Sequence, residues 1–491
     1  MTSFTRSLSI SLLALLALAT TLRVQAQNRD GSRGDGRGGD TTPPNSPTGA
    51  QDPGPRAGNV NAGTPLSSLS PAQLQFFQDG LSRFLQVDSV SGNMAGEPGV
   101  GLGPGFNSNS CASCHGQPAV GGSSPSTQYY PFVGPNPQVA AATDYGGANS
   151  VPFFITLDGP VREARFPFAV SASGNITNTA DGGVHDVFSI AGRQDAEGCV
   201  MPQANFEQMN KIGNLIFRIP TPTFGAGLIE NIPDAAILAN MAANASLKQQ
   251  LGISGHPNYS GNDGSITRFG WKAQNKSLVI FSGEAYNVEM GVTNEAFPNE
   301  RANPPSSCIY NPTPEDETNF SSSGPAIPSD IVEFSNFMRF LAPPAPSTTG
   351  IPGNPSAQSI AAGQAIFTQI GCVACHTASL QTGPSNLTPG LSNQQAALYS
   401  DLLVHNMGSG LADNVSQGSA GPEEFRTAPL WGVGQRIFFL HDGRSGPANG
   451  GLLNAIQAHA SSGSEANRVI NQFNNLSPNQ KQELLNFLRS L

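Results

Sequence analysis

Two short stretches of the chain repeat one arrangement of cysteine and histidine, C-x-x-C-H. In this arrangement two thiols form thioether bonds to a single haem, and the histidine that follows directly becomes the proximal ligand of its iron. A thioredoxin-like redox pair or half of a zinc site also places cysteines at this spacing, but neither requires that histidine. We therefore predict two covalently bound c-type haems. The residues of the two copies are Cys111, Cys114 and His115, and Cys372, Cys375 and His376.

The chain contains six cysteines, so Cys199 and Cys308 lie outside both motifs. An oxidising compartment would permit a disulfide between them. Their separation in space is not fixed by the sequence, and two free buried thiols are the alternative.

Composition sets the limits of the fold. The chain has 491 residues, of which 12% are charged, with a formal charge of −10, 56 glycines and 40 prolines. This length allows two or three domains. Abundant glycine and proline favour loops and turns, so we expect short helices held by long connections. The acidic charge disfavours nucleic acid and anionic membrane surfaces, and it favours a basic protein partner.

The beginning of the chain has the features of an export signal. Arg6 supplies the positive charge, "LSISLLALLALA" the apolar core and "VQA" a small-residue cleavage site. The apolar run is shorter than the ~20 residues that span a bilayer. We therefore expect residues 1–26 to be removed and the mature protein to lie in the periplasm without a membrane span. Residues 27–65 have almost no large apolar side chain, which predicts a flexible leader.

Three helices are expected around the two motifs. Ser70 and Pro71 predict the start of a helix over "PAQLQFFQDGLSRFL", and Ser477 and Pro478 predict the start of another at the C-terminus. A third helix, over "SAQSIAAGQAIFTQIG", runs directly into the second C-x-x-C-H. A helix that leads into a haem-attachment turn, with a further helix closing the domain, is the arrangement of small c-type cytochromes.

The predicted fold is mainly α, with two cytochrome-c-like domains that each carry a covalent haem. The boundary between them is expected in the Pro/Ser/Gly-rich segment "LAPPAPSTTGIPGNPS". The predicted parts are a signal peptide (1–26), a flexible leader (27–65), an N-terminal haem domain with long loop-rich insertions (66–340), a linker (341–356) and a C-terminal haem domain (357–491).

Further motifs resemble a known family. "YSDLLVHNMGSGLAD" is similar to an F-x-D-x-x-x-H-N-x-G segment, and "EFRTAPLWGVGQRIFFLHDGR" to an F-R-T-P-x-L-R-N … P-Y-x-H-D-G segment. "FGWKAQNKSLVIFSGEAYNVEMG" is similar to a stretch that runs from F-W-D-G-R to Glu-Met-Gly. Over most of residues 70–491 the chain thus resembles the bacterial di-haem cytochrome c peroxidase superfamily, and in particular its branch of di-haem oxidoreductases, also labelled thiol oxidoreductases.

The resemblance implies roles for four residues. Trp271 matches a tryptophan that conducts electrons between the haems, although it could also be a core aromatic residue. Glu289 matches the acid–base carboxylate beside the peroxide-binding iron, with a solvated helix residue as the alternative. Arg426 and Arg444 flank the motifs of the second haem, where a guanidinium group could hold a propionate; surface ion pairs are the alternative.

The sixth ligands depart from the family pattern. Where the peroxidases carry a methionine after H-D-G, this chain reaches His459, and Met407 is the competing ligand for the second iron. A haem with two histidine ligands should have a lower potential than one with methionine and histidine. For the first haem, either the iron is open or His185 folds back over it.

The sequence therefore indicates an exported di-haem oxidoreductase. Electrons from a small redox protein would enter at the His376 haem and pass by Trp271 to the His115 haem, where hydrogen peroxide is reduced with Glu289 as acid–base group. Two alternatives are a non-catalytic periplasmic electron carrier with two capped haems, and an oxidase that acts on a thiol or another organic substrate.

Overall fold

The computed structural model describes residues 49–58, 60–125, 135–316, 329–385 and 388–491. The predicted signal peptide lies outside these residues. Residues 49–491 form one compact unit. No helix in the described part of the chain is long and apolar enough to cross a membrane. The α-helices of the described residues are α1 (Pro71–Leu85), α2 (Cys111–Cys114), α3 (Gln138–Ala141), α4 (Phe206–Lys211), α5 (Ala226–Glu230), α6 (Asp234–Ala242), α7 (Ala245–Leu251), α8 (Leu278–Met290), α9 (Asp330–Phe340), α10 (Ala357–Gln369), α11 (Gly451–Gln457), α12 (Asn467–Asn474) and α13 (Pro478–Ser490).

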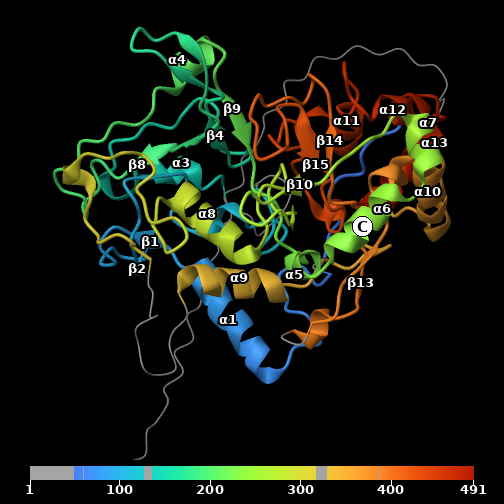
Figure 1. Ribbon diagram of the computed structural model, residues 1–491, viewed down its shortest axis with the longest axis horizontal. Coiled ribbons are helices and arrows are strands. Elements are labelled where there is room, and N and C mark those ends of the chain that lie inside the picture. The colour runs from blue at the N-terminus through green and yellow to red at the C-terminus, as the bar shows by residue number, and fades with distance from the viewer. Residues whose placement is uncertain (1–48, 59, 126–134, 317–328, 386–387) are drawn as a thin grey trace, which may run out of the picture. The chain divides into compact units, whose positions relative to one another are not determined.

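In the described part of the chain, strands are short and pair in small sheets of two or three strands. Helices thus provide most of the regular structure, and they are short and joined by long connections, as the composition predicts (Figure 1). The strands are β1 (Asp88–Ser89), β2 (Gly99–Val100), β3 (Gly105–Phe106), β4 (Glu163–Arg165), β5 (Phe168–Val170), β6 (Ile176–Ala180), β7 (Val184–His185), β8 (Phe188–Ser189), β9 (Ile216–Arg218), β10 (Asn258–Tyr259), β11 (Ile266–Thr267), β12 (Leu380–Gln381), β13 (Gln395–Ala396), β14 (Val404–Asn406) and β15 (Glu424–Arg426).

Helices α1 and α9 pack side by side beside the first C-x-x-C-H motif (Figure 1). Ser70 caps α1 by accepting a hydrogen bond from the backbone N–H of Gln73, as the Ser-Pro start predicts. The close crossing depends on Gly80, where a Cβ would clash with the backbone of α9. Phe84 of α1 packs on Phe337 of α9 with ring centroids 4.7 Å apart.

The second motif has an equivalent helix pair, α10 and α13. The cap predicted at Ser477 is confirmed, since its side chain accepts a hydrogen bond at the start of α13, and Ser356 does the same at the start of α10. Gly363 allows the close crossing, because a Cβ there would clash with the backbone of α13. Phe367 and Phe487 pack across the pair, with ring centroids 5.5 Å apart. The same helix arrangement therefore accompanies both motifs.

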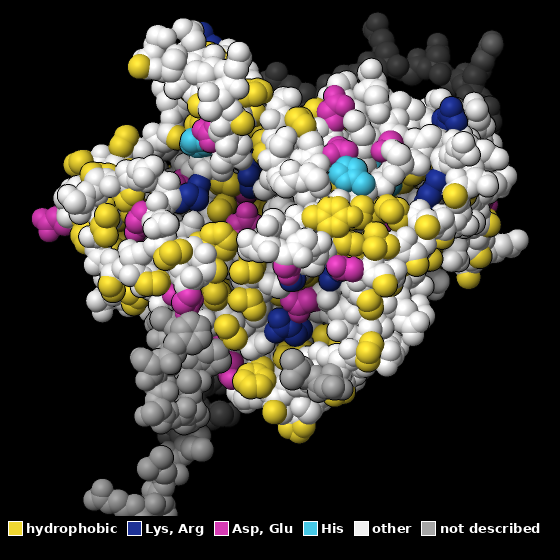
Figure 2. Space-filling view, viewed as in Figure 1, with side chains coloured by type: hydrophobic (Ala, Val, Ile, Leu, Met, Phe, Trp, Pro, Cys, Tyr) yellow, Lys and Arg dark blue, Asp and Glu magenta, His cyan; other side chains and the backbone are white. Residues whose placement is uncertain are grey.

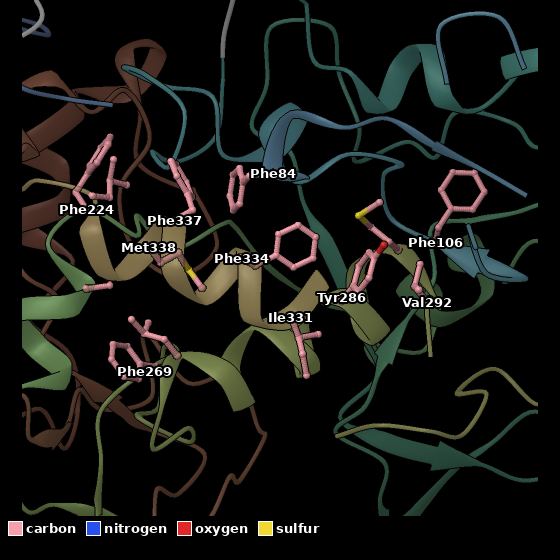
Figure 3. Close-up of a cluster of buried hydrophobic side chains, with 14 of the residues drawn as sticks. Phe84, Phe106, Phe224, Phe269, Tyr286, Val292, Ile331, Phe334, Phe337 and Met338 are labelled. Atoms are coloured by element: carbon pink, nitrogen blue, oxygen red, sulfur yellow. The ribbon is translucent and has the colours of Figure 1, made fainter. Parts of the chain in front are cut away.

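Two separate apolar cores surround these helix pairs. The larger core contains α1, α8 and α9, and its buried aromatic residues include Phe84, Phe334, Phe337 and Tyr286 (Figure 3). The smaller core is built from α10, α11 and α13. Each C-x-x-C-H motif thus has its own apolar surroundings.

The chain before residue 65 differs in part from the predicted flexible leader. In the described range 49–58, Asp52 accepts two hydrogen bonds from the guanidinium of Arg489, at 2.7 and 2.6 Å. The Arg56 side chain is buried and donates to the terminal backbone oxygen of Leu491. Polar contacts with α13 therefore order a segment whose lack of apolar residues predicts disorder.

We expect Asp52→Asn to lower the free energy of unfolding by about 3 kcal/mol, because it leaves the buried Arg489 without its counter-charge. Burial raises the pKa of Asp52, but the hydrogen bond and charge of Arg489 outweigh it, so the pKa lies below its usual value. The stabilisation should be complete above about pH 4 and be lost as the pH falls through the lowered pKa. Urea unfolding followed by circular dichroism measures it. Asp263→Asn, in an exposed ion pair with Lys276, is the matched control and should change nothing measurable.

Candidate functional site

A cavity of about 150 Å³ lies against the first motif and is lined by Cys111, Cys114 and His115. Helix α2 holds the two cysteines on one short turn that ends at His115. The Nδ1–H of His115 donates to the backbone oxygen of Gly122 at 3.0 Å, so Nε2 keeps its lone pair. Burial lowers the pKa of His115 to about 4, which keeps the imidazole neutral.

The second motif lines a larger cavity of about 230 Å³ in the same way. The Nδ1–H of His376 donates to the backbone oxygen of Tyr399 at 2.9 Å, and burial lowers the pKa of this histidine to about 4. Fixing Nδ1 by a backbone carbonyl orients the ring and presents Nε2 as a metal ligand. Both motifs thus satisfy the donor requirements of a haem-attachment site.

Trp271 lies between the two cavities and lines both of them. Its indole N–H donates to the backbone oxygen of Ile219 at 2.9 Å, and its own backbone oxygen accepts from Arg426 at 2.8 Å. Hydrogen bonds to both ends of the residue therefore fix the ring in the wall that separates the cavities.

Glu289 lies on α8 with its carboxyl group in the first cavity, so it is not a solvated helix residue. Glu163, on β4, lines the same cavity, and the two carboxyl groups share a hydrogen bond. Burial, followed by the charge and hydrogen bond of Glu163, raises the pKa of Glu289 well above its usual value. Burial also raises the pKa of Glu163, but the charge of Arg165 and the hydrogen bond to Glu289 outweigh it. These opposite shifts favour a proton on Glu289 and a negative charge on Glu163.

A small sheet supplies the positive charge that keeps Glu163 ionised. The strand order is β7-β4-β9, and Glu163 is directly opposite Arg218 of β9. Arg165 lies two residues further along β4, on the same face, and forms an ion pair with Glu163. Arg218 in turn pairs with the buried Asp413 at 2.5 Å. Glu163 was missed in the sequence, where only its position between two arginines, Arg162 and Arg165, could have indicated it.

His185 does not reach the first cavity. Its Nε2 lies 3.0 Å from Asp181 Oδ2, and its ring stacks on Phe166. Among the described residues that line this cavity, His115 is the only histidine. The structure therefore gives no support to His185 as a ligand of the first iron, and the expectation of an open iron remains.

His459 lines the second cavity. Its Nδ1–H donates to the backbone oxygen of Ala455 at 2.8 Å, so Nε2 keeps its lone pair. Burial lowers the pKa of His459, so the ring is neutral. Met407 lines the same cavity, so both residues stay candidates for the sixth ligand of the second iron.

His405 also lines the second cavity, but both of its ring nitrogens are occupied. Nδ1 lies 2.8 Å from Glu465 and Nε2 lies 3.0 Å from Asp401. Because neither nitrogen has a free lone pair, His405 is a poor candidate for the iron ligand.

Two buried arginines face the second cavity without acidic partners. Arg426 and Arg436 both line it, and the described residues offer no hydrogen-bond partner to Nε of either or to Nη2 of Arg436. Burial lowers the pKa of each to about 10, so both carry a charge at neutral pH. Buried, unpaired guanidinium groups fit the carboxylates of a haem. Arg444, by contrast, is exposed and pairs with Asp442, so the structure does not bring it to this cavity.

Cys199 and Cys308 form a disulfide, as the sequence analysis allowed. Neither residue lines the cavities of the two motifs.

On the face shown in Figure 2, acidic and basic side chains are interspersed, and no large patch of one sign is seen. This face gives no support to an acidic docking patch.

The structure thus has two similar cavities, each lined by one C-x-x-C-H motif and accompanied by its own helix pair. Residues 181–491, well over half of the chain, match the family model described as "Di-haem oxidoreductase, putative peroxidase". The chain belongs to this family. The matched range contains the second C-x-x-C-H but not the first.

The comparison with curated proteins found no match. Among solved structures, hydrazine synthase of Kuenenia stuttgartiensis matches at 16% identity and a TM-score of 0.21, over 34% of this chain and 56% of that one. This chain thus spans little more than half the length of that neighbour. A MauG-like protein associated with microbial copper homeostasis matches at 13% identity and a TM-score of 0.26, over 55% of this chain and 89% of that one. Neither similarity is high enough to bear on fold or activity.

Proposed function

We propose that the protein is a periplasmic di-haem oxidoreductase that reduces hydrogen peroxide in the cavity of His115. Electrons would come from a small redox protein through the cavity of His376. The observation that carries the proposal is that the carboxyl groups of Glu289 and Glu163 lie together in the first cavity, where His115 is the only histidine among the described lining residues.

Each cavity fits a covalently bound c-type haem. Cys111 and Cys114 would provide the thioether bonds in the first cavity, and Cys372 and Cys375 in the second. In the second cavity, the unpaired guanidinium groups of Arg426 and Arg436 would supply the charge that propionates need. Bound haem would supply the iron that accepts electrons and binds the peroxide oxygen.

The carboxyl pair would carry out the proton transfers of peroxide reduction. The ionised Glu163 allows the pair to accept one proton from peroxide. The protonated Glu289 can return a proton to the departing oxygen. Arg165 and Arg218 keep the negative charge on Glu163 rather than on Glu289. The pair should therefore act only while it holds one proton.

Trp271 would connect the two cavities. Its ring lies in the wall between them and is fixed by hydrogen bonds. An electron that passes between the cavities would therefore cross an aromatic ring whose position is fixed. The neutral His459, with a free Nε2, would cap the second iron and restrict that site to electron transfer.

This relay can be tested with Trp271→Phe. We expect electron transfer between the two haems to slow, and peroxide turnover to fall with it. Flash reduction monitored by absorbance measures the transfer rate. Trp431→Phe is the matched control, because Trp431 is the other tryptophan of the chain and lines neither haem cavity. Equal rates in wild type and in both variants would exclude Trp271 from the relay.

A further inference from the structure

Tyr286 is a buried tyrosine of α8 that the proposed reaction does not yet use. It lines the first cavity and is 2% exposed. Its hydroxyl oxygen lies 3.0 Å from Asp88 Oδ2 and 3.0 Å from Asp330 Oδ2. The single phenol proton can be donated to one of these carboxylates at a time, so a proton acceptor is always within hydrogen-bond distance.

A row of aromatic rings joins Tyr286 to the proximal histidine. Phe84 lies 5.9 Å from the ring of His115, Phe334 lies 6.2 Å from Phe84, and Tyr286 lies 5.0 Å from Phe334, all between ring centroids. Figure 3 shows Phe84, Phe334 and Tyr286 side by side in the core, on α1, α9 and α8. The row provides a buried aromatic path for an electron between the phenol and the first haem site.

We infer that Tyr286 is a redox-active tyrosine that gives one electron to the His115 site when peroxide has oxidised it. This inference rests on the proposed peroxide reaction. When no electron arrives from the second cavity, the oxidising equivalent left by peroxide would be held on Tyr286.

The step balances as a coupled transfer of a proton and an electron. The O–H bond of Tyr286 breaks, its proton passes to Asp88 or Asp330, and its electron passes to the oxidised site, which leaves a neutral phenoxyl group. Reduction of hydrogen peroxide to two waters consumes two electrons and two protons, and Tyr286 supplies one of these electrons while a haem supplies the other. Burial raises the pKa of Tyr286 well above its usual value, so the residue begins as a phenol.

Tyr399 provides the natural comparison at the second site. Its ring lies 6.1 Å from Phe367, which lies 6.2 Å from His376, so an aromatic path exists there too. The Tyr399 hydroxyl is hydrogen-bonded to the amide of Gln364, which does not act as a base. The nearby carboxylates thus distinguish Tyr286 from a tyrosine in similar aromatic surroundings.

The test is electron paramagnetic resonance of the oxidised di-haem protein, frozen within seconds of adding hydrogen peroxide without a reductant. We expect a narrow organic-radical signal whose hyperfine structure changes when all tyrosines carry ring deuterium. Tyr286→Phe should remove the signal and Tyr399→Phe should keep it. Site-specific difluorotyrosine at position 286 is nearly isosteric, and its fluorine hyperfine splitting would identify the residue even if Tyr286→Phe folded poorly.

The outcomes separate this inference from the proposed function. Peroxide consumption with no tyrosyl signal, or with a signal unchanged by the substitution at position 286, would overturn the role of Tyr286 and leave the peroxide reaction standing. No reaction of the haems with peroxide would overturn both. A fluorine-split signal would support the inference.

Discussion

Replacing Glu289 with glutamine is expected to slow peroxide turnover by about 10²–10⁴-fold while leaving both haem spectra unchanged. Glutamine fills the same space but cannot hold or release the proton. The loss should appear in kcat as well as in kcat/KM, because the proton is needed during O–O cleavage rather than during binding. Stopped-flow measurement with a reduced electron donor gives both constants.

Glu284→Gln is the matched control for this substitution. Glu284 lies on the same helix and lines the same cavity, but it is bonded to Asn275 and not to Glu163. It should retain near-normal turnover. If Glu289→Gln were as active as the control, Glu289 would have no part in the proton transfers.

The pH profile of the wild type should reflect the shared proton of Glu289 and Glu163. Because the pKa of Glu289 is raised, turnover should fall at high pH, once this residue has lost its proton. It should also fall at low pH, once Glu163 is protonated and the pair has no site for a further proton. Glu289→Gln should remove the high-pH limb.

His459→Met is expected to raise the reduction potential of the second haem by on the order of 0.1 V or more, because a thioether ligand favours ferrous iron relative to imidazole. The prediction follows from the free Nε2 of His459, whose ring is held by Ala455. Spectroelectrochemical titration measures the potential of each haem. The potential of the first haem should stay unchanged.

Met407→Leu distinguishes the two candidate ligands. Leucine retains the volume but has no sulfur, so this variant should keep the wild-type potential if His459 is the ligand. A large shift in Met407→Leu, with none in His459→Met, would assign the sixth position to Met407.

Local chemistry made several features predictable. The C-x-x-C-H spacing and the Ser-Pro helix starts act within a few residues, and the structure has both motifs at cavities and both caps as predicted. The placement of Trp271 and Glu289 followed from family resemblance rather than from local pattern. Both lie at the cavities, which is consistent with the roles proposed for them.

Long-range contacts explain what the sequence could not reveal. Arg436 and Arg444 are both arginines near the same motif, and only the fold shows that the first is buried at the cavity and the second is exposed. Glu163 gains its role from Arg218, which the sheet register places opposite it. Asp52 is ordered by a residue 437 positions away.

Electron paramagnetic resonance of the fully oxidised protein, matured with haem and then treated with cyanide, tests the central claim of one open and one capped iron. We predict a high-spin ferric signal that cyanide converts to low spin, together with a second, low-spin signal that cyanide does not alter. A variant without Cys372 and Cys375 should lose only the cyanide-resistant signal. Two low-spin signals that are both unaltered by cyanide would contradict the account and make the protein an electron carrier.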